Sequence, residues 1–198
     1  MTSETFLALI GLAIATLFTP GPNNAMLATS GANFGFRRTI PHALGVSVGF
    51  PLMVLIVGLL LGQLFQASAL LREGLRWGGA ALLLWIAWKI ANSAGTGTKT
   101  AASRPMTFLG ACAFQWINPK GWSMAIAATS QFIVAEDPVR TALIVTTTFL
   151  ILGLGSSSTW IGLGQAISGW LTTKARHRAF NLMMAALVVL STVELVRH

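Results

Sequence analysis

Two short segments interrupt long apolar stretches of this chain: Thr19-Pro20-Gly21-Pro22-Asn23-Asn24 and Gln115-Trp116-Ile117-Asn118-Pro119-Lys120. Pro20 and Pro119 lie 99 residues apart in a chain of 198 residues. Proline removes a backbone donor and its ring clashes with the preceding turn, so each segment is expected to break a helix. Two breaks separated by half the chain length predict a duplicated protein with a central site built from broken helices.

The composition predicts that the chain is solvated by lipid. Hydrophobic residues make up 54% of the sequence and charged residues 9%, with a mean hydropathy of +0.71. A soluble domain has about 25% charged residues. So few charges cannot cover a water-exposed surface, which indicates an all-α integral membrane protein whose surroundings are the lipid bilayer.

The net charge of +8 and a pI near 11.5 raise the question of nucleic-acid binding. The basic residues are dispersed in short loops between apolar stretches, where they more often set membrane orientation, so no nucleic-acid partner is expected. Cys112 is the one cysteine, which excludes an internal disulfide. No metal-ligand cluster, phosphate loop or nucleophile beside a base is present in the sequence, so neither an enzyme nor a cofactor is expected.

Six stretches are apolar enough for spanning helices, which need about 20 residues. They are 5–29, 40–62, 70–91, 107–133, 140–166 and 179–196. The first and fourth contain the breaks, and the last is the shortest. The loop 92–105 is rich in Gly, Thr, Ser and Lys and reads as a linker. We therefore expect one transmembrane domain over 1–198, with three helices in 1–93 and three in 104–198.

The loop charges predict the orientation in the membrane. The loops after the first, third and fifth stretches hold eight basic residues and no acid: Arg37, Arg38, Lys89, Lys99, Arg104, Lys174, Arg176 and Arg178. The opposite side holds all five acids with four arginines: Glu4, Glu73, Glu136, Asp137, Glu194, Arg72, Arg76, Arg140 and Arg197. Because positive loops stay in the cytoplasm, both termini are expected in the periplasm.

The halves are expected to have inverted topologies. Three spans is an odd number, so the second half enters the membrane from the opposite side, as in many secondary transporters. The offset of 99 residues carries stretch 40–62 onto 139–161, which matches the fifth stretch. The third and sixth stretches match only after a shift of several residues.

Each break is expected to open a half-helix that points its N-terminus at a central site. Thr19-Pro20 and Asn118-Pro119 read as helix starts, with a capping side chain followed by proline at the first helical position. Free N–H groups and the positive dipole end there favour a carboxylate. Lys120, deep in a span, is a candidate for pairing with that carboxylate or for changing protonation. The expected substrate-binding residues are Thr19, Pro20, Gly21, Pro22, Asn23, Asn24, Gln115, Asn118, Pro119 and Lys120.

Simpler interpretations of some features stay open. A proline in a membrane helix can be a plain kink, and Lys120 can extend along its stem to the interface. The pairs Gly45/Gly49, Gly58/Gly62 and Gly74/Gly78 allow close helix crossing, within the chain or in a homodimer. The hydroxyl groups of 156–159 can bond their own helix or line the cavity.

These residues resemble the LysE/RhtB family of amino-acid exporters, in the lysine exporter superfamily. The landmarks are Thr19-Pro20-Gly21-Pro22-Asn23, Gly35-Phe36-Arg37, Gly45 to Gly49, Gly79 through Trp88-Lys89, and Asn118-Pro119-Lys120. Segments 45–50 and 84–91 are most similar to the cysteine/O-acetylserine exporter branch. The resemblance implies about six spans in the bacterial inner membrane and export driven by the proton gradient.

One departure from the family bears on coupling. Many members carry an acidic residue just after the second glycine of span two, where this chain has Phe50. Lys120 is then the deep ionisable residue left. We expect secondary-active export of amino acids or their derivatives by alternating access. The alternative is a small cation transporter or channel, although no intramembrane carboxylate supplies the field that such an ion prefers.

Overall fold

The computed structural model describes residues 1–61, 68–92 and 104–197, and the regular elements within these ranges are all helices. They are α1 (Ser3–Phe18), α2 (Pro22–Phe34), α3 (Phe36–Ile56), the π-helical turn η1 (Val57–Leu61), α5 (Ala69–Ala91), α6 (Phe108–Ile117), α7 (Pro119–Phe132), α8 (Pro138–Ser168) and α9 (Lys174–Arg197). The all-α prediction is confirmed for these ranges.

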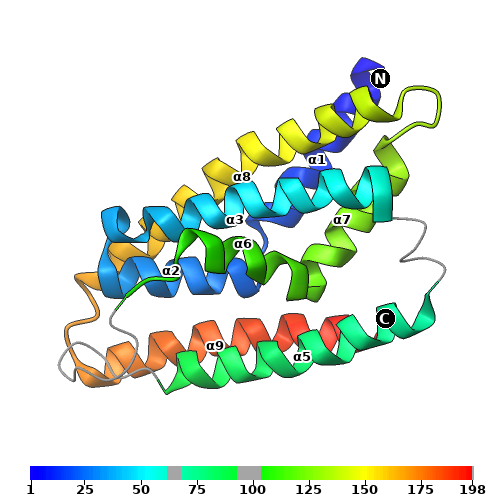
Figure 1. The fold of residues 1–198 in the computed structure, drawn as a ribbon. Helices are drawn as coiled ribbons and strands as arrows, with labels where there is room; N and C mark the ends of the chain where they lie inside the picture. The colour runs from blue at the N-terminus through cyan, green and yellow to red at the C-terminus, as the bar shows by residue number, and fades with distance from the viewer. Residues whose placement is uncertain (62–67, 93–103, 198) are drawn as a thin grey trace.

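The helices run roughly along one axis and form layers (Figure 1). The long helices α3 and α8 lie side by side in one layer. The short helices α2 and α6 lie beneath them, and the pair α5 and α9 forms the opposite face. The breaks between α1 and α2 and between α6 and α7 therefore lie inside the bundle.

The helix after the second break begins at the residue that the sequence predicts, whereas the helix after the first break does not. Pro119 is the first residue of α7, with Asn118 as its N-cap. In the first break, α2 begins at Pro22 rather than Pro20, and Gly21 is the N-cap. Thr19 ends α1 instead of capping α2. The physical reason is Pro22, whose ring disfavours helical geometry in the residue before it.

Glycines let α2 and α6, which form the middle layer, approach their neighbours closely. A Cβ at Gly31 of α2 would collide with the backbone of Ile161 in α8. A Cβ at Gly49 of α3 would lie 2.7 Å from the Cα atom of Cys112 in α6. The pair Gly45/Gly49 therefore packs within the chain, whereas the predicted partner of Gly58, Gly62, lies outside the described residues.

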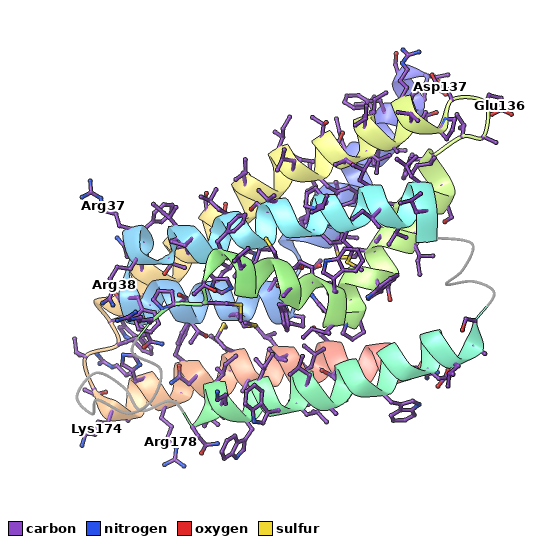
Figure 2. The ribbon with its side chains drawn as sticks, in the orientation of Figure 1. Arg37, Arg38, Glu136, Asp137, Lys174 and Arg178 are labelled. Carbon is purple, nitrogen blue, oxygen red and sulfur yellow. The ribbon has the colours of Figure 1, made fainter. Side chains whose placement is uncertain are left out.

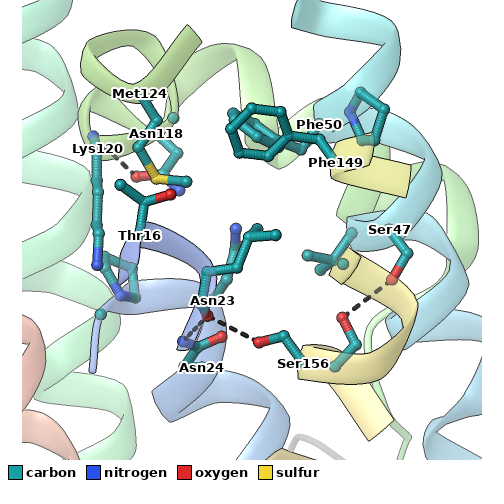
Figure 3. Close-up of a pocket in the computed structure, with 18 residues that line it drawn as sticks. Thr16, Asn23, Asn24, Ser47, Phe50, Asn118, Lys120, Met124, Phe149 and Ser156 are labelled. Atoms are coloured by element: carbon teal, nitrogen blue, oxygen red, sulfur yellow. Dashed lines mark hydrogen bonds between the residues drawn. The ribbon is translucent and has the colours of Figure 1, made fainter. Parts of the chain in front are cut away.

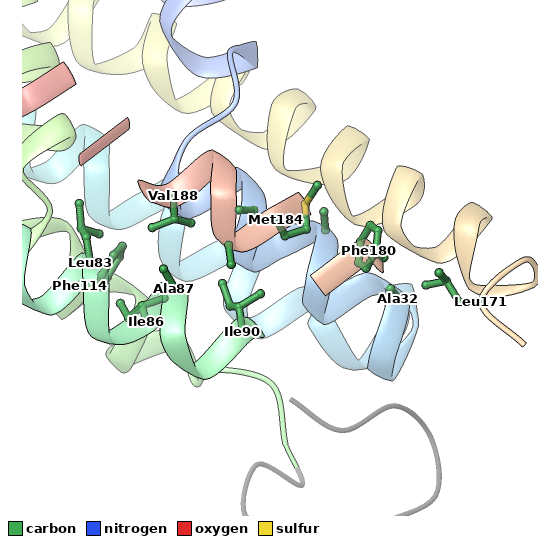
Figure 4. Close-up of a cluster of buried hydrophobic side chains, with 13 residues drawn as sticks. Ala32, Leu83, Ile86, Ala87, Ile90, Phe114, Leu171, Phe180, Met184 and Val188 are labelled. Atoms are coloured by element: carbon green, nitrogen blue, oxygen red, sulfur yellow. The ribbon is translucent and has the colours of Figure 1, made fainter. Parts of the chain in front are cut away.

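Two large clusters of buried apolar side chains, together with a smaller third, stabilise the bundle. One lies among α1, α3, α7 and α8 and includes Leu9, Met53 and Phe149. The other joins α5 and α9 to α2 and α6, with Leu83, Ile86, Phe114, Phe180 and Met184 among its members (Figure 4). The second cluster attaches the α5–α9 face to the middle layer that carries the breaks.

Charged side chains separate to the two ends of the bundle. Arg37, Arg38, Lys174 and Arg178 lie at one end, and Glu136 and Asp137 at the other (Figure 2). Both chain termini lie at the acidic end (Figure 1). There, Arg76 is 3.4 Å from Glu73 and Arg140 is 3.7 Å from Asp137, so these arginines are locally neutralised. The side chains of Arg72, Lys99, Glu194 and Arg197 lie outside the described residues.

Two described helices are by themselves long and apolar enough to cross a membrane: 36–60 and Pro138–Ser168. Together, α1 and α2 meet the same criteria, with a bend of 54° at the break between them. The all-α architecture with these two or three span candidates is consistent with an integral membrane protein.

Candidate functional site

The first break removes helical partners from carbonyl groups of α1. Pro20 has no N–H to donate to the carbonyl of Thr16, and the hydroxyl of Thr19 donates to it instead at 3.0 Å. A buried carbonyl without a partner costs about 1–3 kcal/mol, so such replacements stabilise the break.

Asn24 and Ser156 satisfy the next free carbonyls. Asn24 Nδ2 donates to the carbonyl of Leu17 at 2.8 Å and to that of Thr19 at 2.7 Å. Ser156 Oγ, from α8, also donates to Leu17 at 2.7 Å. The Asn24 amide N–H groups are therefore committed to the backbone, which makes Asn24 a support of the break as well as a cavity residue.

The second break satisfies itself. Asn118 Oδ1 accepts a hydrogen bond from the Lys120 backbone N–H at 3.2 Å, which caps α7. The indole N–H of Trp122 donates to the carbonyl of Trp116 at 2.8 Å. All of these partners come from within a few residues of the break, so this end of α7 is closed by its own side chains.

Lys120 connects the two breaks. Its Nζ atom donates to Thr19 Oγ1 and to the Pro20 carbonyl oxygen, both at 3.2 Å. The stem passes over Gly21, where an added Cβ would lie 2.8 Å from Nζ and 3.1 Å from the Lys120 Cδ atom. The absence of a side chain at Gly21 is what lets the lysine reach the first break.

A second bridge joins the middle-layer helices. Asn23 Nδ2 donates to Gln115 Oε1 at 2.8 Å, and Gln115 Nε2 donates back to Asn23 Oδ1 at 3.2 Å. Gln115 is fully buried and also donates to the Ala111 carbonyl at 2.9 Å. This reciprocal amide pair fixes α2 against α6 next to both breaks.

A cavity of about 40 Å³ lies beside the breaks, with room for a few water molecules. Its walls come from α1, α2, α3, α7 and α8 together with Gly21 and Asn118 of the breaks (Figure 3). The lining residues are Thr16, Leu17, Gly21, Pro22, Asn23, Asn24, Val46, Ser47, Phe50, Pro51, Asn118, Lys120, Gly121, Met124, Phe149, Gly153, Ser156 and Ser157.

The cavity brings together six of the residues that the sequence indicated: Gly21, Pro22, Asn23, Asn24, Asn118 and Lys120. The other four lie just behind the lining. Thr19 and Pro20 hold the lysine, Gln115 holds Asn23, and Pro119 begins α7.

Polar residues from the two long helices complete one wall. Ser47 Oγ of α3 donates to Ser157 Oγ of α8 at 3.0 Å, and Ser156 lies next to this pair. Ser156 and Ser157 of α8 therefore line the cavity, which was one of the two interpretations of the hydroxyl groups of 156–159. Thr159 follows the other interpretation and donates to the Gly155 carbonyl of its own helix at 2.8 Å.

An aromatic pair closes another side of the cavity. Phe50 of α3 and Phe149 of α8 meet edge to face, with ring centroids 5.4 Å apart (Figure 3). They lie 99 residues apart, the same separation as Pro20 and Pro119. Sequence reasoning missed their contact, although the repeated offset was the signal that could have found it.

The electrostatics of the lining favour an anion at α2. The N-terminus of α2 has no side-chain cap, whereas α7 is capped by Asn118. Lys120 Nζ lies within hydrogen-bond distance of the residues that precede α2. None of the described lining residues is a carboxylate. A helix N-terminus next to an ammonium group is suited to a small carboxylate.

One known family covers the part of the chain that carries this site. The model of a family described as LysE type translocator matches residues 14–198 of this chain, which include both breaks and every residue of the cavity lining.

Curated bacterial proteins are similar over nearly their whole length. A protein of Klebsiella pneumoniae named cysteine/O-acetylserine efflux protein is 32% identical over 201 residues, covering 99% of each chain. A protein with the same name from Salmonella choleraesuis is 30% identical, and the match covers 92% of each chain. Another from Escherichia coli K12 is 27% identical, and the match covers 98% of this chain and 99% of that protein. No solved structure matches.

Proposed function

We propose a function from one premise, that the chain belongs to the LysE type translocator family. The protein exports amino acids or their derivatives across the bacterial inner membrane as a secondary transporter. The efflux proteins to which it is similar are named for cysteine and O-acetylserine. Small neutral amino acids of this kind are therefore the first substrates to test.

The proposed architecture is six spans in two inverted halves, 1–93 and 104–198. Within one transmembrane domain, α1–α2, α3 and α5 correspond to α6–α7, α8 and α9. Support comes from the pairing of corresponding helices, since α3 lies beside α8 and α5 beside α9. The contact between Phe50 and Phe149, at the duplication offset, is what an axis between the halves produces.

We place the basic end of the bundle in the cytoplasm and both termini in the periplasm. The support is the separation of charge, because positive loops stay on the cytoplasmic side. The arginines described at the acidic end are paired with acids within 4 Å, which strengthens the net difference between the ends.

The observation that carries the binding proposal is the position of Lys120 over the uncapped start of α2. The substrate carboxylate binds the first-turn N–H groups of α2 and displaces the Lys120 ammonium from the Pro20 carbonyl. Asn23, Asn24 and the serines of α3 and α8 offer oxygen atoms to the substrate amino group. Charge-assisted hydrogen bonds of this kind contribute about 1.5–3 kcal/mol each.

Transport requires the cavity to change shape, because about 40 Å³ is too small for an amino acid. The Phe50–Phe149 contact blocks the route from the cavity to the periplasm. The route to the cytoplasm is blocked by the close crossings of α2 with α8 and of α3 with α6, which lie on the cytoplasmic side in this orientation. We propose that the halves rock to open these two routes alternately.

We assign proton coupling to Lys120, since it is the one ionisable residue among the described residues that line the cavity. Displacement of the ammonium group by the substrate alters its hydrogen-bonding, and a lysine in a cavity shifts its protonation readily. In this scheme Lys120 releases its proton to the cytoplasm when the substrate displaces it and regains one from the periplasm when the substrate leaves. The protonated empty carrier then returns, so one proton enters for each substrate exported.

Inside-out vesicles give the direct test, because export appears as uptake. Vesicles containing the protein should accumulate labelled cysteine or O-acetylserine under a proton gradient, and a protonophore should abolish accumulation. Vesicles from cells carrying an empty vector are the control. Accumulation of a labelled divalent cation in place of amino acids would favour the cation-transporter alternative and remove this proposal.

A further inference from the structure

A second hollow, separate from the substrate cavity, lies between α5 and α6 and reaches α2 and α3. Its volume is about 500 Å³, and it shares no described lining residue with the cavity at the breaks. Its walls are mainly apolar, with Leu82, Ile86, Phe114 and Ile117 along its length. Trp85 and Ile117 are about half exposed, so the groove is open to the surroundings of the bundle.

The groove has the length of one membrane leaflet. It follows α6 from Ile117, beside the second break, to Arg104 and Pro105, just before that helix begins. The ten residues of α6 rise about 15 Å, which is half of a hydrocarbon core of about 30 Å. In the orientation proposed above, the groove extends from the bilayer centre to the cytoplasmic surface.

Basic side chains line the groove at its outer end. Lys89 and Arg104 both belong to the lining. Lys89 Nζ lies 4.2 Å from the ring centroid of Trp85, so the ammonium group is held over an aromatic wall. This end of the bundle also carries Arg37, Arg38, Lys174 and Arg178 (Figure 2). The charge is complementary to an anionic headgroup.

Polar atoms without hydrogen-bond partners lie behind the deeper wall of the groove. His42 is 2% exposed, and neither of its ring nitrogens has a hydrogen-bond partner among the described residues. Thr29 Oγ1 is in the same state. Both residues line the groove. These polar atoms are closed to solvent even with the groove empty, so they lie behind its surface and the occupant is argued from the basic end and the apolar wall.

We propose that this groove binds an anionic phospholipid of the inner leaflet. Lys89 and Arg104 bind the phosphate, and one acyl chain lies along α6 towards Ile117. The bilayer placement rests on the proposed function. The lipid then fills the space between α5 and the helices that form the substrate site.

Retention of lipid by the purified full-length protein tests this proposal. The wild-type protein in detergent is mixed with phosphatidylglycerol or phosphatidylcholine of the same acyl chains, and bound lipid is counted by native mass spectrometry. We expect one phosphatidylglycerol to be retained about tenfold more strongly than phosphatidylcholine. Equal retention of the two lipids overturns the proposal and needs no variant.

Variants then locate the site. The double variant Lys89→Gln/Arg104→Gln should lose the preference, whereas Lys174→Gln/Arg178→Gln removes the same charge from the same end and should keep it. Ala113→Phe fills the apolar wall and should release lipid with both charges intact. Equal losses of lipid preference in both double variants would mean that diffuse surface charge attracts the lipid. A change in dimer formation without a change in lipid retention would mean that a second copy of the chain occupies the groove. Either result overturns the assignment.

Two further outcomes separate this inference from its premises. Glycerol phosphate, which has the headgroup chemistry without acyl chains, should not displace the bound lipid at millimolar concentration; displacement contradicts the groove assignment. Lipid retention is measured without transport. A protein that exports amino acids but retains no anionic lipid contradicts this inference alone, and one that retains the lipid but exports nothing contradicts the proposed function alone.

Discussion

The two helix breaks occupy equivalent positions in the sequence and have different structures. The first spans Thr19–Gly21, and its free carbonyls are satisfied by side chains from α2, α7 and α8. The second is the single residue Asn118, and its own neighbours satisfy it. The first break therefore depends on tertiary contacts and leaves an open helix N-terminus, while the second is a rigid local turn that presents Lys120 to the first.

Among the tests that compare the two breaks, the largest effect is expected from removing the Lys120 ammonium group, which joins them. Lys120→Met keeps the length of the stem and removes its charge, and we expect export in inside-out vesicles to fall by about 100-fold, as loss of a charge-assisted hydrogen bond predicts. Lys174→Met, at the surface, is the matched control and should transport normally. Export at the wild-type rate by the Lys120→Met protein would contradict the proposed role of Lys120 in binding and coupling.

The next test keeps the lysine and changes the first break, over which its side chain lies. Gly21→Ala places a Cβ 2.8 Å from Lys120 Nζ, so the side chain must swing away. The backbone at Gly21 is extended, which alanine adopts without strain. We expect a rise of about tenfold in the KM for export with little change in Tm. Gly162→Ala, where nothing lies within 4 Å, controls for insertion and expression. An unchanged KM contradicts the placement of the lysine.

Stability measurements compare how the two breaks are supported. Asn24→Leu leaves two carbonyls of the first break without this donor, and we expect a loss of about 2–3 kcal/mol in the free energy of unfolding. Trp122→Phe removes one donor from the second break and should cost about 1 kcal/mol. Denaturant titration in detergent measures both. A larger loss for Trp122→Phe would reverse the comparison.

The smallest expected effect is the coupling between Asn23 and Gln115. A double-mutant cycle with Asn23→Ala and Gln115→Ala should give a coupling free energy of about 1 kcal/mol, in the range measured for hydrogen bonds within membrane proteins. Thr159→Ala combined with Gln115→Ala should give none, since Thr159 bonds its own helix. Absence of coupling in the first cycle would mean that the amide pair does not hold α2 against α6.

The positions of the breaks could be predicted because proline acts locally. The start of α7 at Pro119 follows from the cap at Asn118, but two prolines in the first segment compete, and Pro22 rather than Pro20 begins the helix. The reach of Lys120 to Thr19 and Pro20 could not be predicted, since it depends on how α7 packs against α1 and α2. Ser47 and Phe149 entered the site for the same reason, through the crossing of α3 and α8.

The pairing of Gly21 with Lys120 bears on how such a chain could arise. In a dimer of two identical half-length subunits, both positions would hold the same residue. Two glycines would leave the site without a cation, and two lysines about 4 Å apart would repel each other by about 4 kcal/mol at an effective dielectric constant near 20. Under the duplication proposed above, fusion of the halves into one chain would let the two copies diverge, so that a single charge lies between the breaks.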